Sequence, residues 1–295
     1  MSVLVTGANG VVGYEIAKKL SKKFKIIGIF RKKNLKTKVI KNIEWLRFDL
    51  KNKLNIKIKP KIKFVIHCAI DQTNLYKSNK SKYVNENIKI FKNVLNFAKK
   101  NKVKLFINLS SIDVYGKIKT DYLKEENQPK SQNIYGFTKF LLEKMLKESK
   151  LDYVNLRLPG ILSEIKNTKQ STPFLNLIFY NLRFNRTLKI YGPYNKFNNV
   201  ISTDEIVKFI FFLFKKKKIK GTFNFSSRKP ILIKKILEIS KKKLQSKSKI
   251  IYYKNEKIKS FCISTKKLEK KLRYKTSTTL KEINDYIKKL NDKVS

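Results

Sequence analysis

The first half of the chain alternates between short, wholly apolar runs and longer segments whose apolar residues recur every three or four positions. The short runs predict strands, because a strand buried on both faces shows no polar alternation. The longer segments predict helices with one apolar face. The expected strands are 2–6, 25–29, 43–48, 63–67, 103–109 and 153–158, and the expected helices are 11–22, 82–100 and 132–149.

Strands that alternate with helices indicate parallel βαβ units. The sequence therefore predicts an α/β fold built on a doubly wound parallel sheet of the Rossmann kind. After Pro159 the rhythm changes to helices at 174–184, 203–214, 231–244 and 279–290 with short strands at 188–191 and 221–225. We expect a dinucleotide-binding domain over 1–160 and a smaller mixed α/β substrate region over 161–295, with parts near 200–230 returning to the main domain.

Composition supports a globular protein without membrane spans. The chain has 295 residues, of which 41% are hydrophobic, and its most apolar late stretch, 206–214, contains Lys208 and is far shorter than the roughly 20 residues of a spanning helix. The first apolar run, Ser2–Val5, is short and leads straight into a glycine motif, so we expect no signal peptide. Two cysteines, Cys68 and Cys262, are too few for a disulfide framework or a metal cluster. We expect free thiols, no metal site and a cytoplasmic location.

The charge is unusual, with 70 Lys+Arg against 21 Asp+Glu and a formal net charge of +49. Such a balance favours association with polyanions. The lysines are nevertheless spread along the whole chain, without an arginine-rich block or a nucleic-acid-binding module. Charge alone supports only non-specific association, so we expect no specific nucleic-acid partner.

A glycine motif at the start of the chain carries the strongest chemical signal. Residues 3–13 read VLVTGANGVVG, which places Gly7, Gly10 and Gly13 between an expected strand and an expected helix. Glycines there allow a tight turn and a close approach of the backbone to a pyrophosphate, which the helix N-terminus attracts. This context predicts a dinucleotide-binding loop.

A second motif is Tyr135-x-x-x-Lys139 on the expected helix 132–149. Positions four apart share a helix face, so the phenol and the ammonium point to one site. A cation near a phenol favours the phenolate and brings the group into a useful range for proton transfer. The pair follows Ser110-Ser111 at the end of an expected strand, where doubly wound folds bind ligands.

Together these residues resemble the extended short-chain dehydrogenase/reductase family over almost the full length. Further similarities are Phe48-Asp49-Leu50, the strand end Val65-Ile66-His67-Cys68-Ala69, the helix segment Tyr83-Val84-Asn85, the turn Val114-Tyr115-Gly116, the strand end Leu156–Gly160 and the late strand Phe223-Asn224-Phe225. The resemblance implies that Tyr135 is the general acid/base, that Lys139 lowers its pKa and holds the nicotinamide ribose, and that Ser111 polarises the reacting oxygen. It assigns His67, the sole histidine, a structural role at a strand end.

Charge at the end of the second expected strand bears on the cofactor. NAD sites usually place an acid there for the ribose hydroxyls, whereas residues 28–33 read GIFRKK and contain no acid. Because Arg31 or Lys32 can pair with a 2′-phosphate, we expect NADP(H) in preference to NAD(H). The expected cofactor contacts are Gly7, Asn9, Gly10, Val11, Val12, Gly13, Arg31, Asp49, Leu50, Cys68, Ala69, Asn85, Tyr135, Lys139 and Pro159.

Three departures from the family concern the substrate. Residues 198–204 carry asparagine where many sugar-nucleotide enzymes of the family have arginine, Gly160 stands in place of an asparagine, and Asp113 does not form the Asp-Glu pair of the dehydratases. Lys196 or Arg186 offers an alternative diphosphate contact. The lack of an Asp-Glu pair at Asp113 favours an epimerase or a reductase over a dehydratase.

The sequence thus predicts an NAD(P)-dependent epimerase or reductase of a nucleotide-activated sugar. Two alternatives stay open: an NADP-dependent reductase of another small carbonyl compound, and a non-catalytic cofactor-sensing protein with this fold. The resemblance also implies a homodimer formed through the helices 82–100 and 132–149.

Overall fold

The computed structural model describes residues 2–32, 39–56, 61–73, 79–163, 174–253 and 260–292. The chain forms two units. The first comprises Met1–Lys117, Gln128–Arg157 and Ile206–Phe223, and the second comprises Ile118–Asn127, Leu158–Glu205 and Asn224–Ser295. The segment 118–127 thus groups with the second unit, although it lies within the expected first domain, and the segment 206–223 groups with the first.

The first unit is built on a seven-stranded sheet with the order β12-β7-β5-β4-β1-β2-β3. The pairings β1–β2, β1–β4, β2–β3 and β4–β5 are parallel. This order reverses direction between β1 and β4, which is where open α/β sheets bind ligands. The strands are β1 (Ser2–Thr6), β2 (Lys25–Phe30), β3 (Ile43–Arg47), β4 (Ile62–His67), β5 (Leu105–Ser111), β7 (Tyr153–Leu158) and β12 (Lys220–Asn224).

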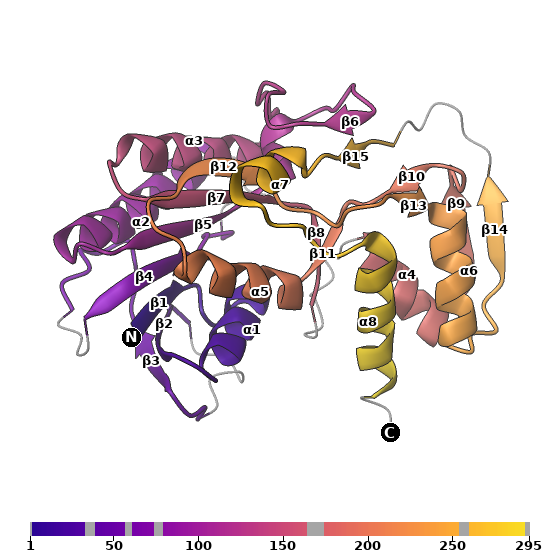
Figure 1. Cartoon of the computed structure of the whole chain (residues 1–295), viewed down its shortest axis with the longest axis horizontal. Helices are drawn as coiled ribbons and strands as arrows, with labels where there is room; N and C mark the ends of the chain where they lie inside the picture. Colours follow the sequence, from indigo (N-terminus) through magenta and orange to yellow (C-terminus); the bar gives the residue numbers. More distant parts are fainter. Residues whose placement is uncertain are drawn as a thin grey trace. The chain divides into compact units, whose positions relative to one another are not determined.

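Helices cover both faces of this sheet, with α2 and α3 on one face and α1 and α5 on the other (Figure 1). Asparagine side chains cap two of them: Asn79 accepts a hydrogen bond from the Lys82 amide, and Asn133 accepts one from Gly136. Such caps fix where a helix begins. The helices are α1 (Val11–Leu20), α2 (Lys80–Lys100), α3 (Ile134–Glu148) and α5 (Thr203–Phe214), and a 3-10 helix η1 (Ile112–Tyr115) follows β5.

The core of the first unit lies between the sheet and the pair α2 and α3. Leu4, Val65, Phe91, Phe106 and Leu142 are buried together there. These residues come from the wholly apolar strands and the apolar helix faces that the sequence pattern indicates. Burial of this set holds the carboxyl ends of the strands in fixed positions.

The second unit has its own core and several two-stranded sheets. Leu182, Ile190, Ile236, Leu237 and Ile283 are buried in that core. Its elements are β6 (Tyr122–Leu123), β8 (Gly160–Leu162), α4 (Phe174–Arg183), β9 (Leu188–Tyr191), β10 (Lys196–Phe197), β11 (Val200–Ser202), β13 (Ile231–Leu232), α6 (Ile233–Lys243), β14 (Ile250–Tyr253), β15 (Cys262–Ile263), α7 (Lys266–Leu272) and α8 (Thr279–Asn291).

The predicted doubly wound parallel fold is confirmed. Each expected helix and strand of the first unit is present, with bounds that shift by a few residues. The two- and three-residue strands of the second unit, such as β8 and β11, were not predicted, because so few residues show no periodicity.

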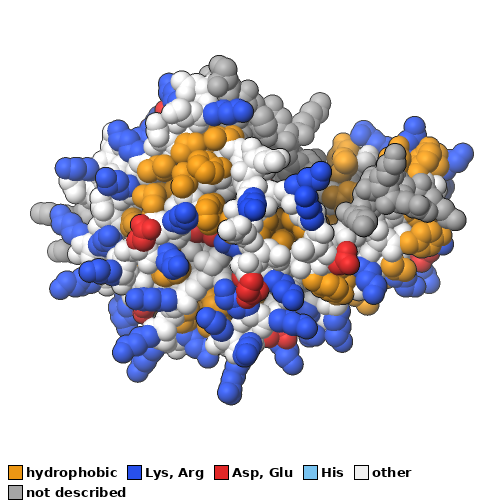
Figure 2. Space-filling model, turned by 90° about the horizontal axis from the view of Figure 1, so that it is seen from above, with side chains coloured by type: hydrophobic (Ala, Val, Ile, Leu, Met, Phe, Trp, Pro, Cys, Tyr) orange, Lys and Arg blue, Asp and Glu red, His pale blue; other side chains and the backbone are white. Residues whose placement is uncertain are grey.

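Basic side chains are spread over the molecular surface. Figure 2 shows lysines and arginines across the whole face that it draws, with few acidic side chains between them. This distribution matches the even spacing of lysines along the chain. Among the described residues, no helix is both long and apolar enough to span a membrane.

Candidate functional site

The glycine loop lies between β1 and α1 and leaves no room for side chains at two positions. Gly7 has a φ of +64°, and a Cβ atom there would come within 2.9 Å of the Ala69 backbone. A Cβ at Gly13 would lie 2.3 Å from the carbonyl oxygen of Gly7. The middle glycine is less constrained, since a Cβ at Gly10 would lie 3.2 Å from the same oxygen. Gly7 and Gly13 therefore set the close packing of this loop.

The loop begins α1 without a side-chain cap. The N-cap residue, Gly10, makes no side-chain hydrogen bond to the first turn, which contains Val11, Val12 and Gly13 and has no acidic residue. The side chain of Asn9 donates a hydrogen bond to the Lys32 carbonyl and ties the loop to the end of β2. A helix N-terminus in this arrangement is suited to an anion.

The end of β4 faces this loop across the switch point of the sheet. The Cys68 amide donates to the Thr6 carbonyl at 3.3 Å, and the Ala69 amide donates to the Thr6 hydroxyl at 3.4 Å. The two strand ends are therefore joined at the point where the topology places a ligand. Burial raises the pKa of the Cys68 thiol to about 12, although the Lys139 ammonium acts in the opposite direction.

His67 is a core residue. It is fully buried, shares a 2.9 Å hydrogen bond with the Thr6 hydroxyl through Nδ1, and packs against the rings of Phe91 and Phe106. Burial, with a further contribution from the Lys139 ammonium, lowers its pKa to about 3. A neutral imidazole in this position orders the strand end, as the sequence resemblance implies.

Asp49 and Leu50 lie in the turn after β3. The Asp49 carboxylate accepts a hydrogen bond from the Lys51 amide at 2.9 Å, and Leu50 is buried. The turn is also tied to α2, because the side chain of Asn93 donates to the Leu50 carbonyl at 2.9 Å. The Phe48 amide donates to the carbonyl of Phe30, the last residue of β2, at 2.8 Å, which places the turn beside the end of that strand.

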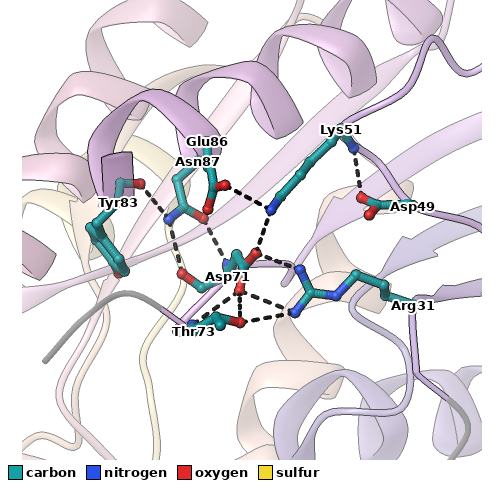
Figure 3. A network of polar contacts seen from close by, with 8 residues as sticks. All are labelled: Arg31, Asp49, Lys51, Asp71, Thr73, Tyr83, Glu86 and Asn87. Atoms are coloured by element: carbon teal, nitrogen blue, oxygen red, sulfur yellow. Dashed lines mark hydrogen bonds and ion pairs between the residues drawn. The ribbon is translucent and has the colours of Figure 1, made fainter. Parts of the chain in front are cut away.

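Arg31 follows β2 directly, but its guanidinium is already paired. It forms an ion pair with Asp71 through Nη1, and its Nη2 donates to the second carboxylate oxygen at 3.1 Å and to the Thr73 hydroxyl at 3.2 Å. Figure 3 shows this network. The expected preference for NADP(H) relied on Arg31 or Lys32, and Arg31, which is paired with Asp71, lends that preference no support.

Asn87, not Asn85, makes the structural bonds of α2. Asn85 is exposed and donates to the Ser81 hydroxyl. Asn87 is buried, accepts from the Asp71 amide at 2.7 Å, and donates to the carbonyls of Asp71 and Tyr83 at 3.0 Å and 2.9 Å. Asn87 was missed because two asparagines flank Glu86, and a sequence does not show which of them faces the sheet.

Ser111 ends β5 and caps the 3-10 helix η1. Its hydroxyl accepts a hydrogen bond from the Asp113 amide and donates to the Asp113 carboxylate, both at 3.1 Å. It also lies close enough to the phenol of Tyr135, in the first turn of α3, to lower the pKa of that phenol. The close approach of α3 to η1 depends on Gly136, where a Cβ would lie 2.2 Å from the Asp113 carbonyl oxygen. Ser111 and Tyr135 are thus brought together.

Tyr135 and Lys139 lie on the same side of α3. The Lys139 ammonium is 5.8 Å from the centre of the Tyr135 ring and donates to the Leu109 carbonyl at 2.7 Å. Burial raises the pKa of Tyr135, with a further contribution from Asp113, whereas the hydrogen bond to Ser111 lowers it. Burial lowers the pKa of Lys139 to about 8, opposed by Cys68 and Glu143. Lys139 thereby links the tyrosine to the β4 end of the glycine-loop site.

A buried ion pair joins α3 to β7 close to Lys139. One turn after Lys139, Glu143 binds the Arg157 guanidinium of β7 through three contacts of 2.7–3.2 Å. Glu143 also accepts a 2.5 Å hydrogen bond from the Ser110 hydroxyl, and the guanidinium stacks 4.6 Å from the Tyr115 ring. Glu143 was not among the predicted site residues, although its i+4 spacing from Lys139 was available as a signal.

The remaining expected residues belong to the second unit. Pro159 is buried at the end of β7, and Gly160 begins β8. The amide side chain of Asn198 is buried and donates to the carbonyls of Ser227 and Ile263 while accepting from the Ile263 amide, each at 2.8 Å. This residue therefore has a structural role in that unit.

The geometry fits a nicotinamide dinucleotide. Gly7 and Gly13 form a cradle that a Cβ atom would fill, and the N-terminus of α1 offers backbone donors to a pyrophosphate. Asp49, Cys68 and Ala69 surround the same strand ends. Among the described residues, no group of three or more His, Cys, Asp or Glu side chains is arranged to hold a metal ion.

Comparisons with known proteins agree with this site. Residues 3–225 match the NAD dependent epimerase/dehydratase family. No curated protein matches the sequence. Solved structures with the same fold include UDP-N-acetylglucosamine 4-epimerase from Methanobrevibacter ruminantium M1 in complex with UDP-N-acetylmuramic acid, with 22% identity, 99% of this chain and 98% of that chain covered, and a TM-score of 0.82.

Two further structures show the same likeness. UDP-glucuronic acid 4-epimerase from Bacillus cereus in complex with NAD is 21% identical, with 98% and 97% of the chains covered and a TM-score of 0.78. UDP-glucose 4-epimerase from Thermotoga maritima with UDP-glucose is 17% identical, with both chains fully covered and a TM-score of 0.78. The family match covers most of this sequence, and the fold is shared over its whole length. The chain belongs to the NAD dependent epimerase/dehydratase family and is an NAD-dependent enzyme of the extended short-chain dehydrogenase/reductase type.

Proposed function

We propose that this protein is an epimerase that inverts one carbon of a nucleotide-activated sugar with the help of bound NAD. The observation that carries the proposal is the arrangement of Ser111, Tyr135 and Lys139 at the carboxyl edge of the sheet that also carries the glycine loop. The solved structures with this fold that are described above are UDP-sugar 4-epimerases. A UDP-sugar is therefore the proposed substrate class.

The chain's own residues supply the proton chemistry. Tyr135 accepts the proton of the reacting sugar hydroxyl and later returns a proton to the same oxygen, while the Ser111 hydroxyl donates a hydrogen bond to that oxygen. Lys139 favours the phenolate form of Tyr135 by its positive charge. Gly7, Gly10 and Gly13 bind the pyrophosphate of the dinucleotide. When bound, the nicotinamide supplies the group that accepts and returns a hydride.

Burial favours the neutral phenol of Tyr135, so the acid/base role depends on positive charge placed close to that phenol. The pKa of Tyr135 is raised and that of Lys139 is lowered to about 8, so the ammonium remains largely charged near neutral pH. A positive charge close to the phenol and a partly dry environment strengthen their interaction. Tyr135 is still partly accessible, which a group that meets a substrate requires.

We favour an epimerase over the two alternatives from the sequence. A non-catalytic sensor has no need of a serine, a tyrosine and a lysine joined in one site. A reductase needs the same residues but releases the oxidised cofactor after each turnover. The fold neighbour from Bacillus cereus that is described above with NAD is a UDP-glucuronic acid 4-epimerase, and Arg31 is paired with an acid. NAD(H) is accordingly the proposed cofactor in place of NADP(H).

The test is turnover of UDP-glucose, UDP-glucuronic acid and UDP-N-acetylglucosamine, with product epimers identified by proton NMR. We expect one or more of them to be interconverted, and we expect Tyr135→Phe to lower the rate by about 100-fold or more. The control is Tyr253→Phe, which removes the hydroxyl of a partly exposed tyrosine in the second unit. Full activity of Tyr135→Phe with a confirmed substrate contradicts the assigned mechanism.

Two further expectations stay proposals. We propose a homodimer formed through α2 and α3, supported by the exposed Phe137 ring on α3, and light scattering during size-exclusion chromatography measures it. We also propose a reducing, cytoplasmic location, supported by the free thiols of Cys68 and Cys262.

A further inference from the structure

Asp71 is a buried carboxylate at the end of β4, beside the end of β2. Its side chain is 2% exposed, whereas that of Arg31 is 35% exposed. Three cationic or hydroxyl side chains converge on it: Arg31 binds both of its oxygens, the Lys51 ammonium lies 3.1 Å from Oδ2, and the Thr73 hydroxyl donates to Oδ1 at 2.6 Å. Figure 3 shows these groups pointing toward the carboxylate.

The carboxylate is fixed independently of Arg31. Asn87 binds the backbone of Asp71 on both sides, at its amide and at its carbonyl. The Thr73 amide adds a 3.0 Å hydrogen bond to Oδ1. Because these bonds come from α2 and from the local turn, the acid stays in place and the flexible arginine side chain is bound to it.

Positive and negative charges are nearly balanced around Arg31, whereas basic residues are in large excess in the whole chain. Arg31 and Lys51 are matched by Asp71 and Glu86, whose carboxylate lies 3.1 Å from the Lys51 ammonium. Asp49 is also near enough to favour the charged form of Arg31. In a chain with 70 basic and 21 acidic residues, three acids thus gather around one arginine.

Arg31 holds the position at which doubly wound folds distinguish the two nicotinamide cofactors. An arginine there accommodates a 2′-phosphate only when its guanidinium can turn toward the phosphate. In this protein the Arg31 guanidinium already binds the carboxylate of Asp71. The negative charge of Asp71 would also repel a 2′-phosphate. An unphosphorylated ribose brings no such charge. The exposed Lys32 is the next cation along the turn.

We propose that Asp71 is a specificity-determining residue that occupies Arg31 and thereby selects NAD(H) over NADP(H). This inference builds on the proposed function, because it names the cofactor of the same site. The inference concerns which dinucleotide the protein binds and not whether it turns over a sugar. A protein that binds the cofactors as expected but does not epimerise sugars contradicts the proposed function and leaves the role of Asp71 intact.

The experiment measures the dissociation constants of NAD⁺ and NADP⁺ for the full-length protein, freed of cofactor, by isothermal titration calorimetry. We expect the wild type to bind NAD⁺ more tightly by about tenfold or more. Asp71→Asn keeps the shape of the side chain and removes its charge. We expect it to shift the ratio toward NADP⁺ by about tenfold or more, in the range of close charge pairs.

Two controls separate a specific effect from a general change in charge. Glu86→Gln removes one negative charge from the same cluster without freeing Arg31, and we expect it to leave the ratio within about threefold of the wild type. In the double variant Asp71→Asn/Arg31→Leu, the gain for NADP⁺ should disappear, since it depends on the released arginine.

The proposal is overturned by a wild type that prefers NADP⁺, by a folded Asp71→Asn variant with an unchanged ratio, or by an equal shift in Glu86→Gln. If Asp71→Asn does not fold, the ratio of the two dissociation constants in Arg31→Gln tests the proposal on its own. If Asp71 holds the Arg31 guanidinium, Arg31→Gln should not weaken the binding of NADP⁺ relative to that of NAD⁺. A selective loss of NADP⁺ binding in that variant shows that Arg31 serves the phosphate.

Discussion

The Lys139 ammonium donates a hydrogen bond to the backbone carbonyl of Leu109 at 2.7 Å. This contact joins helix α3, which carries the proposed acid/base Tyr135, to the strand β5, two residues before Ser111. It holds the ammonium beneath the Tyr135 ring and close to the thiol of Cys68. The positive charge is thereby fixed between the expected proton-transfer group and the end of β4.

Replacing Lys139 removes this charge. We expect Lys139→Met to lower the rate of epimerisation by about 100-fold or more, because the phenolate of Tyr135 loses its nearby cation. Steady-state kinetics with an identified UDP-sugar measures the effect. Lys144→Met is the matched control, since Lys144 is exposed on the same helix with its ammonium over the Phe140 ring. Equal losses in both variants would show that the effect is a general one on α3.

The glycine loop gives a graded prediction. A methyl group at residue 13 would lie 2.3 Å from the Gly7 carbonyl oxygen, and one at residue 10 would lie 3.2 Å from it. We therefore expect Gly13→Ala to displace the loop and to weaken NAD⁺ binding far more than Gly10→Ala. Overpacking of this kind costs about 1–3 kcal/mol in stability. Calorimetric titration together with thermal unfolding measures both effects, and a stronger effect at residue 10 would contradict the loop geometry.

The buried ion pair between Glu143 and Arg157 gives a prediction on stability. Arg157→Leu leaves the Glu143 carboxylate buried without its cation, so we expect a loss of about 3–5 kcal/mol in the free energy of unfolding. The double variant Arg157→Leu/Glu143→Leu should recover part of that loss. Urea unfolding monitored by circular dichroism measures the three proteins. A single variant as stable as the wild type would show that the pair does not hold α3 against β7.

Glu282 of α8 gives a prediction on pH. Burial raises its pKa from 4.5 to about 7, with a further contribution from Glu205 and in spite of a hydrogen bond from Ser202. The folded protein therefore binds this proton more tightly than the unfolded chain, and the free energy of unfolding should fall as pH rises from about 4.5 to 7. The expected contribution is on the order of 1–3 kcal/mol.

Denaturation midpoints at several pH values test this prediction. Glu282→Gln should remove the component of the slope between pH 4.5 and 7, because glutamine does not titrate. Glu269→Gln is the control, since Glu269 lies in α7 of the same unit. An identical pH profile for the wild type and Glu282→Gln would show that this carboxyl does not titrate in the folded protein near pH 7.

Much of the first unit could be predicted because its signals are local. The strand β1, the glycines that follow it and the helix α1 are contiguous, and the Tyr135–Lys139 spacing places both groups on one helix face. The doubly wound topology then determines which strand ends meet. These relationships depend on period and position, which a sequence displays directly.

The contacts that the sequence did not reveal join residues far apart in the chain. Arg31 and Asp71 are separated by 40 positions, and Asp71 and Asn87 by 16. Whether an arginine next to a strand end is available for a phosphate depends on such a partner. The short strands of the second unit were missed for a related reason, since their pairing and not their composition defines them.

The most direct test of the central claim measures whether the cofactor is recycled. The protein loaded with NAD⁺ is incubated with an excess of a UDP-sugar substrate, while absorbance at a wavelength specific for reduced nicotinamide is recorded and the product is followed by proton NMR. An epimerase predicts many turnovers for each bound cofactor and no net accumulation of its reduced or oxidised form. Oxidised product formed only in proportion to the NAD⁺ consumed, with no epimer, would contradict the account and identify a dehydrogenase.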